Sequence, residues 1–168
     1  TPITGATVLD WKGFCGDATG FRPKSDFGDA PASYDPVALS PALHEKDTTL
    51  FMGKVFATDW DQEFNKLSST DATGDGDDDN DGLTFLSIFD PSTNTYFATA
   101  QVYNRTGAAA RLIAWFDYNA NGVFDASEAI TPISIPSSTA VHWVNLSWTS
   151  INSPLITGSS TFVRVRLT

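Results

Sequence analysis

The stretch TFVRVRLT, residues 161–168, carries the clearest secondary-structure signal in the sequence. Apolar and basic side chains alternate strictly along it: Val163, Val165 and Leu167 are separated by Arg164 and Arg166. Side chains of a β-strand point to opposite faces at every second residue, whereas a helix repeats about every 3.6 residues. The stretch is therefore predicted to be a half-buried strand, with its valines and leucine toward the core and its arginines toward acids or solvent.

Four other segments of the second half show the same alternation. The residues between them contain turn-forming sequences, such as DPSTN at 90–94 and NRTG at 104–107, and no long helical repeat. Short strands at close spacing without intervening helices favour an antiparallel β-sandwich. The expected strands are LTFLSIF (Leu83–Phe89), TYFATAQVY (Thr95–Tyr103), ARLIAWF (Ala110–Phe116) and VHWVNLSW (Val141–Trp148).

The first half of the chain is less regular. The sequences TGATVLDW (4–11) and LFMGKVF (50–56) are candidate strands, but residues 27–47 contain three prolines and no sustained period. That segment is predicted to be a long ordered loop, and residues 67–82 are predicted to form another. Long loops are uncommon in compact domains unless something fixes their conformation.

The charge balance narrows the range of partners. A chain of 168 residues is long enough for one well-filled core, and a single domain over residues 1–168 is the simplest division. Twenty acidic residues against ten basic ones leave a net charge of −10. Such a chain repels nucleic acid and anionic membranes and attracts cations. A solvated acidic surface, as in many extracellular proteins, is the alternative explanation of the charge.

The cysteine count bears on how the domain is stabilised. Cys15 is the only cysteine, so no internal disulfide can form, and a secreted domain of this kind needs another stabilising element, such as a bound metal. No apolar run is long enough to span a membrane and no signal-peptide pattern is present, so membrane insertion is not expected. The two ends of the chain suggest a segment of a larger polypeptide.

The segment DYNANGVFDASE, residues 117–128, has the spacing of a calcium-binding loop, D-x-[DN]-x-[DN]-G-x5-E. In such a loop alternate residues donate oxygens, a glycine allows a sharp turn, and a final glutamate closes the shell with both carboxylate oxygens. A hairpin turn centred on Asn-Gly is the alternative, and both interpretations can hold together. The candidate ligands are Asp117, Asn119, Asn121, the Val123 carbonyl, Asp125 through a water, and Glu128, with Gly122 at the turn.

A second acidic region is SSTDATGDGDDDNDGL, residues 68–83. Its aspartates repel one another, and a divalent cation would relieve the repulsion by taking oxygens from several of them. A disordered acidic linker is the alternative, although a predicted strand begins immediately afterwards at Leu83. The aspartates are Asp71, Asp75, Asp77, Asp78, Asp79 and Asp81.

Two smaller acidic groups are further candidates for metal binding. Acids at alternate positions of an extended segment face the same side and can converge on one ion. Ordinary solvent-facing positions, beside a buried Trp60 in the first group, are the alternative. The residues are Asp59, Asp61 and Glu63 in ATDWDQE, and Asp26 and Asp29 in SDFGDAPASY.

Taken in order, these motifs resemble the GEVED-type domains of bacterial surface proteins. The resemblance runs from about Asp26 to Leu167 and comprises DFGDAP, Ala-x-His, Gly-x-Val, GDGDDDNDG, the Trp-x-Asp-x-Asn-x-Asn-Gly loop and the closing VRVRL. It implies a calcium-stabilised β-sandwich of a large secreted adhesin. This sequence departs from the family's pattern at Asn80, where a glutamate is usual, and at Gly76, which interrupts an acidic pair. The ligands that the resemblance implies are Asp26, Asp29, Asp78, Asp79, Asp81, Asp117, Asn119 and Asn121.

We therefore expect an all-β antiparallel sandwich whose long loops are stabilised by Ca2+. Its expected role is that of a non-enzymatic module of an extracellular bacterial adhesin, as a spacer or as a binder of a glycan or protein on a host or neighbouring cell. A calcium-dependent carbohydrate-binding module is the alternative, in which Trp11, Trp60, Trp143 or Trp148 stacks on a sugar; Trp60 is the least core-like of them. A glycosidase needs two carboxylates facing each other at about 5 to 9.5 Å, and no accompanying catalytic groups are recognisable.

Overall fold

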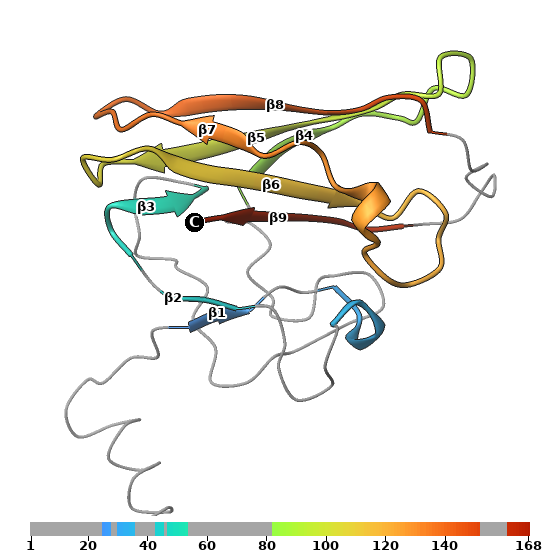
Figure 1. Cartoon of the computed structure of the whole chain (residues 1–168), viewed down its shortest axis with the longest axis horizontal. Helices are drawn as coiled ribbons and strands as arrows, with labels where there is room; N and C mark the ends of the chain where they lie inside the picture. The colour runs from blue at the N-terminus through green and yellow to red at the C-terminus, as the bar shows by residue number, and fades with distance from the viewer. Residues whose placement is uncertain (1–24, 28–29, 36–42, 46, 54–81, 152–160) are drawn as a thin grey trace, which may run out of the picture.

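The computed structural model describes residues 25–27, 30–35, 43–45, 47–53, 82–151 and 161–168 (Figure 1). These residues form nine strands and two single 3-10 turns, and the described part of the chain contains no α-helix. The predicted all-β class is thus confirmed. The strands are β1 (Ser25–Phe27), β2 (Leu43–Glu45), β3 (Leu50–Met52), β4 (Leu83–Leu86), β5 (Tyr96–Asn104), β6 (Ala110–Phe116), β7 (Ile133–Ile135), β8 (His142–Trp148) and β9 (Val163–Leu167), and the turns are η2 (Ala32–Tyr34) and η3 (Ala126–Glu128).

The larger sheet is built around β5, the longest strand. β8 pairs with β5 along its length, from Tyr96 opposite Trp148 to Val102 opposite His142. β3 and β4 pair with opposite ends of β5, and since Val102 and Ala98 each pair with β8 as well, both short strands lie along the other edge. All these pairings are antiparallel, as expected for a sandwich.

The second sheet has the order β7-β6-β9, also antiparallel. Its strands run in roughly the same direction across Figure 1 as those of the larger sheet, and the short β1–β2 ladder lies apart from both. Stacking of the Tyr96 ring on the Phe116 ring, at 4.1 Å between centroids, joins the two sheets at one end of the core. The arrangement is therefore sandwich-like, with apolar side chains of both sheets between them.

The core follows from alternation along each strand. In β5, Ala98, Ala100 and Val102 are buried, and in β6, Leu112 and Ala114 are fully buried. The small side chains of Ala98 and Ala100 leave space over the middle of β5, and larger buried side chains pack around them. The large buried side chains nearby include Leu146, Phe116, Trp148 and Ile135.

The predicted orientation of the closing strand is confirmed. Leu167 is buried, and Val163 and Val165 pack against the core from β9. Arg164 points the other way and forms an ion pair with Asp35, at 3.3 Å between guanidinium and carboxylate, with only 12% of its side chain exposed. Burial lowers the pKa of Arg164, and the neighbouring Asp35 charge opposes that shift.

The prediction that residues 27–47 are only a loop is wrong. The segment contributes to the β1–β2 ladder and contains η2. These elements were not predictable from alternation, because three-residue strands are too short to show a period. β7 was missed for the same reason. The predicted strand 83–89 is too long, because β4 ends at Leu86, after a register shift between Leu83 and Phe85. No helix of the described residues is long and apolar enough to cross a membrane.

Gly82 provides a test of how closely β3 and β4 approach each other. It has a φ of +71°, and a Cβ atom there would lie 2.5 Å from Met52 Cβ. Gly107 has a φ of +86° with open space around its Cα. Alanine at either position adopts an unfavourable left-handed conformation, at a cost of about 1–2 kcal/mol. Gly82→Ala must in addition displace β3, and we expect about 1–3 kcal/mol of further destabilisation.

Urea denaturation of Gly82→Ala and Gly107→Ala measures that difference directly, because the two variants share the backbone cost. Equal losses of unfolding free energy would contradict the close approach of Gly82 to Met52.

Candidate metal centre

The loop 117–128 begins where β6 ends and is anchored at both ends by main-chain contacts. The Asp117 N–H donates to the Phe162 carbonyl at 3.1 Å, and the Thr161 hydroxyl donates to the Asp117 carbonyl. After the loop, the Ile130 N–H donates to the Ala114 carbonyl at 2.9 Å. The expectation that a strand leads into the loop is confirmed, and the loop ends in η3.

The first half of the loop is a set of tight turns held by its own polar side chains. Asp117 Oδ1 accepts the Asn121 N–H at 3.2 Å, and Asp117 Oδ2 accepts the Gly122 N–H at 3.0 Å. Asn119 Oδ1 also accepts the Asn121 N–H, at 2.9 Å. Gly122 has a φ of +81°, which an L side chain adopts only with strain. The loop is therefore compact, and the glycine stands where the calcium-loop spacing requires one.

Glu128 closes the loop from η3. Its Oε2 accepts the Asp125 N–H at 2.9 Å, in a capping box with Asp125 as the N-cap. The Glu128 side chain is fully buried, and its second oxygen, Oε1, has no hydrogen-bond partner. A buried carboxylate oxygen without a partner is costly, because its lost hydration is not replaced. Glu128 Oε1 is thus free to accept a cation or a proton.

The electrostatic surroundings of Glu128 are unfavourable for its charge. Burial raises the pKa of Glu128 above its ordinary value, and the charges of Asp117 and Asp125 raise it further, while hydrogen bonds from the backbone oppose the shift. Asp117 is itself fully buried. Three carboxylates at the two ends of one short loop therefore repel one another, and a divalent cation among them would remove the repulsion.

The amide side chains of the loop turn toward its third carboxylate. Asn121 Nδ2 donates to Asp125 Oδ2 at 2.9 Å, and Asn119 Nδ2 lies 3.5 Å from the same oxygen. Asn121 Oδ1 accepts the Val123 N–H at 2.9 Å. Asp117, Asn119, Asn121, Asp125 and Glu128 are thus brought into one network, as the spacing predicts.

Among the residues that the structure describes, no group of three or more histidine, cysteine, aspartate or glutamate side chains is arranged to hold a metal ion by itself. A calcium shell in this loop would combine carboxylates with neutral oxygens, those of Asn119, Asn121 and the Val123 carbonyl. Calcium accepts such oxygens readily in a shell of 6–8 ligands. Glu128 Oε1, which has no hydrogen-bond partner, is a further oxygen that could bind the ion.

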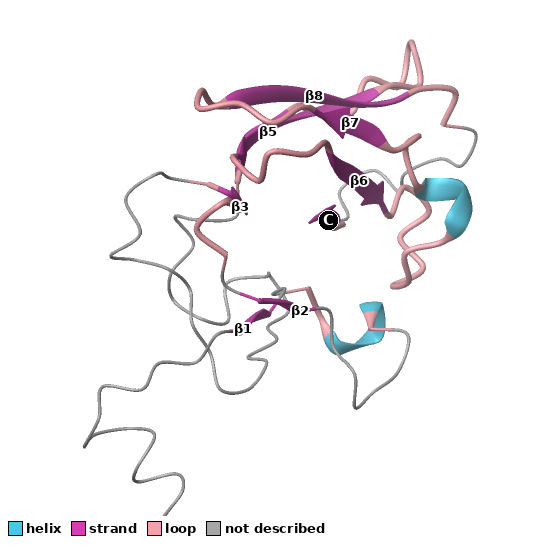
Figure 2. Ribbon diagram, turned by 60° about the vertical axis from the view of Figure 1, so that its left-hand side comes forward, coloured by secondary structure: helices cyan, strands magenta, loops and turns pink. Residues whose placement is uncertain are grey.

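Tyr34 is a residue of this site that sequence analysis missed. From η2 its hydroxyl donates to Asp117 Oδ2 at 2.6 Å, and its ring packs against Phe124 and Phe162. Figure 2 shows the helical turns η2 and η3 on the same side of the molecule, as does Figure 1. Burial and the hydrogen bond to Asp117 raise the pKa of the Tyr34 phenol, so it stays a hydrogen-bond donor at neutral pH.

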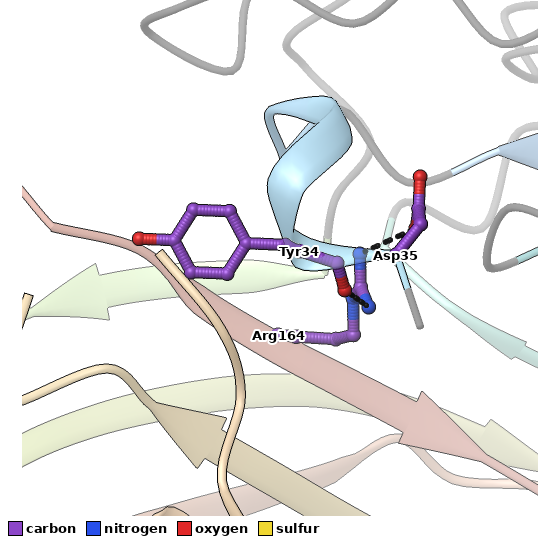
Figure 3. A network of polar contacts seen from close by, with 3 residues as sticks. All are labelled: Tyr34, Asp35 and Arg164. Atoms are coloured by element: carbon purple, nitrogen blue, oxygen red, sulfur yellow. Dashed lines mark hydrogen bonds and ion pairs between the residues drawn. The ribbon is translucent and has the colours of Figure 1, made fainter. Parts of the chain in front are cut away.

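Arg164 ties the same segment to the second sheet (Figure 3). Its guanidinium donates to the Tyr34 carbonyl at 3.0 Å and pairs with Asp35. It also lies over the Phe124 ring of the loop, with 4.8 Å from Cζ to the ring centroid. Three parts of the chain that are distant in sequence meet at these contacts.

Most of the other predicted ligands lie outside the described residues. Asp26 lies on β1, where its Cα is opposite that of His44 on β2. Outside the described residues are Asp29, Asp59, Asp61, Glu63, Asp71, Asp75, Asp77, Asp78, Asp79 and Asp81, together with Trp60 and Trp11. Their roles stay predictions.

The two described tryptophans that were candidates for sugar stacking have different surroundings. Trp148 is buried in the core with 5% of its surface exposed, and its Nε1 donates to the Glu128 carbonyl at 2.8 Å. Trp143, five residues earlier on the same strand, is 59% exposed. Of the two, only Trp143 is accessible to a ligand.

The sequence matches no protein-family model, and no curated protein or solved structure is significantly similar to it. The functional interpretation therefore rests on the chemistry of the loop and of the sheet faces.

The buried Glu128 carboxylate predicts a pH dependence in metal-free protein. At a pH below the ordinary pKa of a glutamate, Glu128 is protonated in both the folded and the unfolded state, so its ionisation has no effect on stability. As pH rises, the unfolded chain releases this proton first, because the pKa of Glu128 is raised in the folded state. The contribution of Glu128 to the unfolding free energy therefore becomes unfavourable through this window and stays so above it.

Urea denaturation in chelator, from about pH 4 to about pH 8, of wild type and Glu128→Gln isolates this contribution from those of the other acids. The variant is expected to gain stability relative to wild type as pH rises. Parallel curves would show that Glu128 ionises as easily in the folded protein as in the unfolded chain.

Proposed function

We propose that this chain is a calcium-stabilised extracellular module of a bacterial adhesin, which mediates or supports attachment at the cell surface. The observation that carries the proposal is the fully buried Glu128 carboxylate, whose Oε1 has no partner at the closing position of a calcium-type loop. A cation at this place would satisfy that oxygen and reduce the repulsion from Asp117 and Asp125.

The residues that would hold the ion are those of the loop itself. Calcium prefers oxygen ligands in a flexible shell, whereas magnesium requires a tighter octahedral shell and keeps its waters. A loop that offers carboxylates, amide oxygens and a carbonyl favours calcium for this reason. The proposed ligands are Asp117, Asn119, Asn121, the Val123 carbonyl, Asp125 and Glu128.

A second calcium site is proposed in the acidic block that ends at Asp81. β4 begins at Leu83, immediately after this block, as the sequence predicted. An ion held by the block would lie close to the first residues of the larger sheet. The proposed ligands are Asp75, Asp77, Asp78, Asp79 and Asp81, with Asp26, Asp29, Asp59, Asp61 and Glu63 as further candidates.

The adhesin role is supported by the resemblance to GEVED-type domains and by the single cysteine. A secreted domain without a disulfide needs another cross-link, and calcium would supply it. The module is proposed to be non-enzymatic. A second candidate function, carbohydrate binding, is favoured by the exposure of Trp143.

Calcium titration of metal-free protein by isothermal calorimetry tests the proposal. Wild type is expected to bind calcium at two or more sites, and Asp117→Ala is expected to lose one of them. Asp90→Ala is the matched control, because Asp90 is an exposed aspartate whose side chain caps a turn through Ser92 and Thr93. Absence of calcium binding by wild type would refute the proposal. Full binding by Asp117→Ala would move the sites to the block at residues 71–81.

Attachment is tested by display of the domain on bacteria that do not adhere to cultured cells. Display of wild type is expected to increase the number of attached bacteria in calcium, and Asp117→Ala is expected to reduce it more than Asp90→Ala does. Equal attachment with and without the displayed domain would contradict an adhesive role.

A further inference from the structure

The outer face of the larger sheet is the most aromatic surface among the described residues. Alternation on β5 buries Ala98 and Ala100 and turns Phe97, Thr99 and Gln101 outward. On β8 the same alternation turns Trp143, Asn145 and Ser147 outward, and on β4 it turns Phe85 outward, opposite Thr99. Cross-strand pairing places Trp143 beside Gln101, Asn145 beside Thr99, and Ser147 beside Phe97.

One end of this face is covered and the other is open. At the β3 end the Phe51 and Tyr103 rings stack at 4.6 Å, and the Arg105 guanidinium lies over Tyr103, which is buried. Beyond Tyr103 the face is open: Trp143, opposite Gln101, and then Phe85 and Phe97 are all exposed. A single exposed aromatic side chain is ordinary, whereas three on one face of a sheet are typical of a binding surface.

The three exposed aromatics surround a polar centre. Four residues of β5, about 13 Å of strand, separate Phe97 from the position opposite Trp143, and Phe85 lies about midway along. Between them Thr99 Oγ1 lies 3.4 Å from Asn145 Oδ1, and Gln101 Nε2 donates to the Tyr103 hydroxyl at 2.9 Å. Within the described part of the chain Asn145 Nδ2 makes no hydrogen bond, so it can donate to a ligand.

The lack of charged side chains in the open part of this sheet face indicates which kind of ligand it can bind. Between Trp143 and Phe97 the outward residues of β4, β5 and β8 carry no acidic or basic group, although the chain has a net charge of −10, and the Arg105 guanidinium lies at the covered end, over Tyr103. An anionic ligand would be repelled by the acidic chain, and a cationic one would find no carboxylate here. An uncharged ligand with hydroxyl groups is complementary to neutral amides and hydroxyls among aromatic rings.

We propose that this face binds an uncharged polysaccharide, with Trp143 as its main stacking platform. The C–H bonds on one side of a sugar ring give it an apolar face that packs on an indole, while its hydroxyls at the rim need hydrogen-bond partners. Asn145, Gln101 and Thr99 supply them. The distance between Trp143 and Phe97 exceeds one sugar ring, so the ligand is a chain of several sugars.

This inference deepens the proposed function by naming a ligand class, and it rests on that function only for the role in attachment. The face belongs to β4, β5 and β8, whereas the candidate calcium loop follows β6. Binding is therefore expected with calcium present and, as long as the domain stays folded, in chelator.

Affinity electrophoresis tests the proposal in native gels that contain hydroxyethylcellulose, xylan, galactomannan or laminarin, with alginate as an anionic comparison. At least one neutral polysaccharide is expected to retard wild type, and alginate is expected not to. Trp143→Ala should weaken the binding at least tenfold and Asn145→Ala by a smaller factor. Ile88→Ala is the control, because it removes another exposed apolar side chain, 93% exposed and outside the strands.

Thermal unfolding of each variant verifies that it is folded, which the exposure of Trp143 favours. Three results would overturn the proposal: no retardation of wild type by any neutral polysaccharide, unchanged retardation of both Trp143→Ala and Asn145→Ala, or a Trp143-dependent dimer in sedimentation without retardation. Running each gel with calcium and with chelator separates the two proposals. Trp143-dependent retardation without any calcium binding supports the glycan face alone, and calcium binding without retardation supports the calcium site alone.

Discussion

Trp148→Ala is expected to lower the free energy of unfolding by about 3–5 kcal/mol, the usual cost of removing a buried tryptophan. Trp148 is 5% exposed and packs against the rings of Tyr96 and Phe116, each at 5.7 Å between centroids. Its loss also leaves the Glu128 carbonyl without the 2.8 Å hydrogen bond from the indole. Since the whole stability of a domain is about 5–15 kcal/mol, this substitution removes a large part of it.

Trp143→Ala is the matched control, because it changes the same residue type on the same strand. Trp143 is largely exposed, so its removal is expected to change the unfolding free energy by no more than about 0.5–1 kcal/mol. Urea denaturation of both variants at one pH and one calcium concentration gives the comparison. Losses of similar size would mean that the register of β8 against β5 is wrong.

Calcium is expected to raise the melting temperature of the wild-type domain by several degrees. An ion at about a hundred times its dissociation constant adds about 2.7 kcal/mol, and a site close to half saturation adds much less. For a chain of this length each kcal/mol corresponds to about 2–4 °C. Restoring calcium after chelation should recover the full melting temperature, and magnesium should not, because it dehydrates reluctantly.

Glu128→Gln makes this prediction sharper, because its effect should change sign with calcium. In chelator the variant lacks the unfavourable buried charge and is expected to melt at or above wild type near neutral pH. In calcium it lacks a ligand charge and is expected to melt below wild type. Asn119→Ala, which removes a neutral ligand, should weaken the calcium effect less than Asp117→Ala.

Thermal unfolding of these proteins, each in calcium and in chelator, is the measurement. Identical melting of wild type in both conditions would end the structural-calcium hypothesis. A full calcium response of both Asp117→Ala and Glu128→Gln would place the stabilising ion outside this loop.

The longer strands of the second half, β5, β6, β8 and β9, were predictable because each has enough residues to show its period. β6 coincides with the predicted segment 110–116, β5 lies one residue later than predicted at both ends, and β8 begins one residue later than predicted. The segments that were missed, β1, β2 and β7, have three residues each. Three residues are too few to reveal a period of two. Such short strands form because they can pair with the edge of a neighbouring strand, which depends on tertiary context.

In the candidate site, too, contacts between residues close in sequence were predictable and contacts between distant segments were not. The loop 117–128 is contiguous, so its spacing alone predicted that Asp117, Asn119, Asn121 and Asp125 lie together and that Glu128 closes the loop. The contact of Tyr34 with Asp117 spans 83 residues, and no local pattern encodes it. The same is true of Arg164, whose outward direction followed from alternation but whose partner, Asp35, did not.

By itself the sequence determined the properties that depend on neighbouring residues: the direction of each side chain along a strand, the turn at Gly122, and the order of oxygen donors in the loop. Only the tertiary structure decided which outward side chains are covered. Trp143 and Trp148 follow the same alternation on one strand, yet one faces solvent and the other lies in the core. The physical reason is that alternation separates two faces without saying which of them another sheet will cover, and burial is a property of that packing.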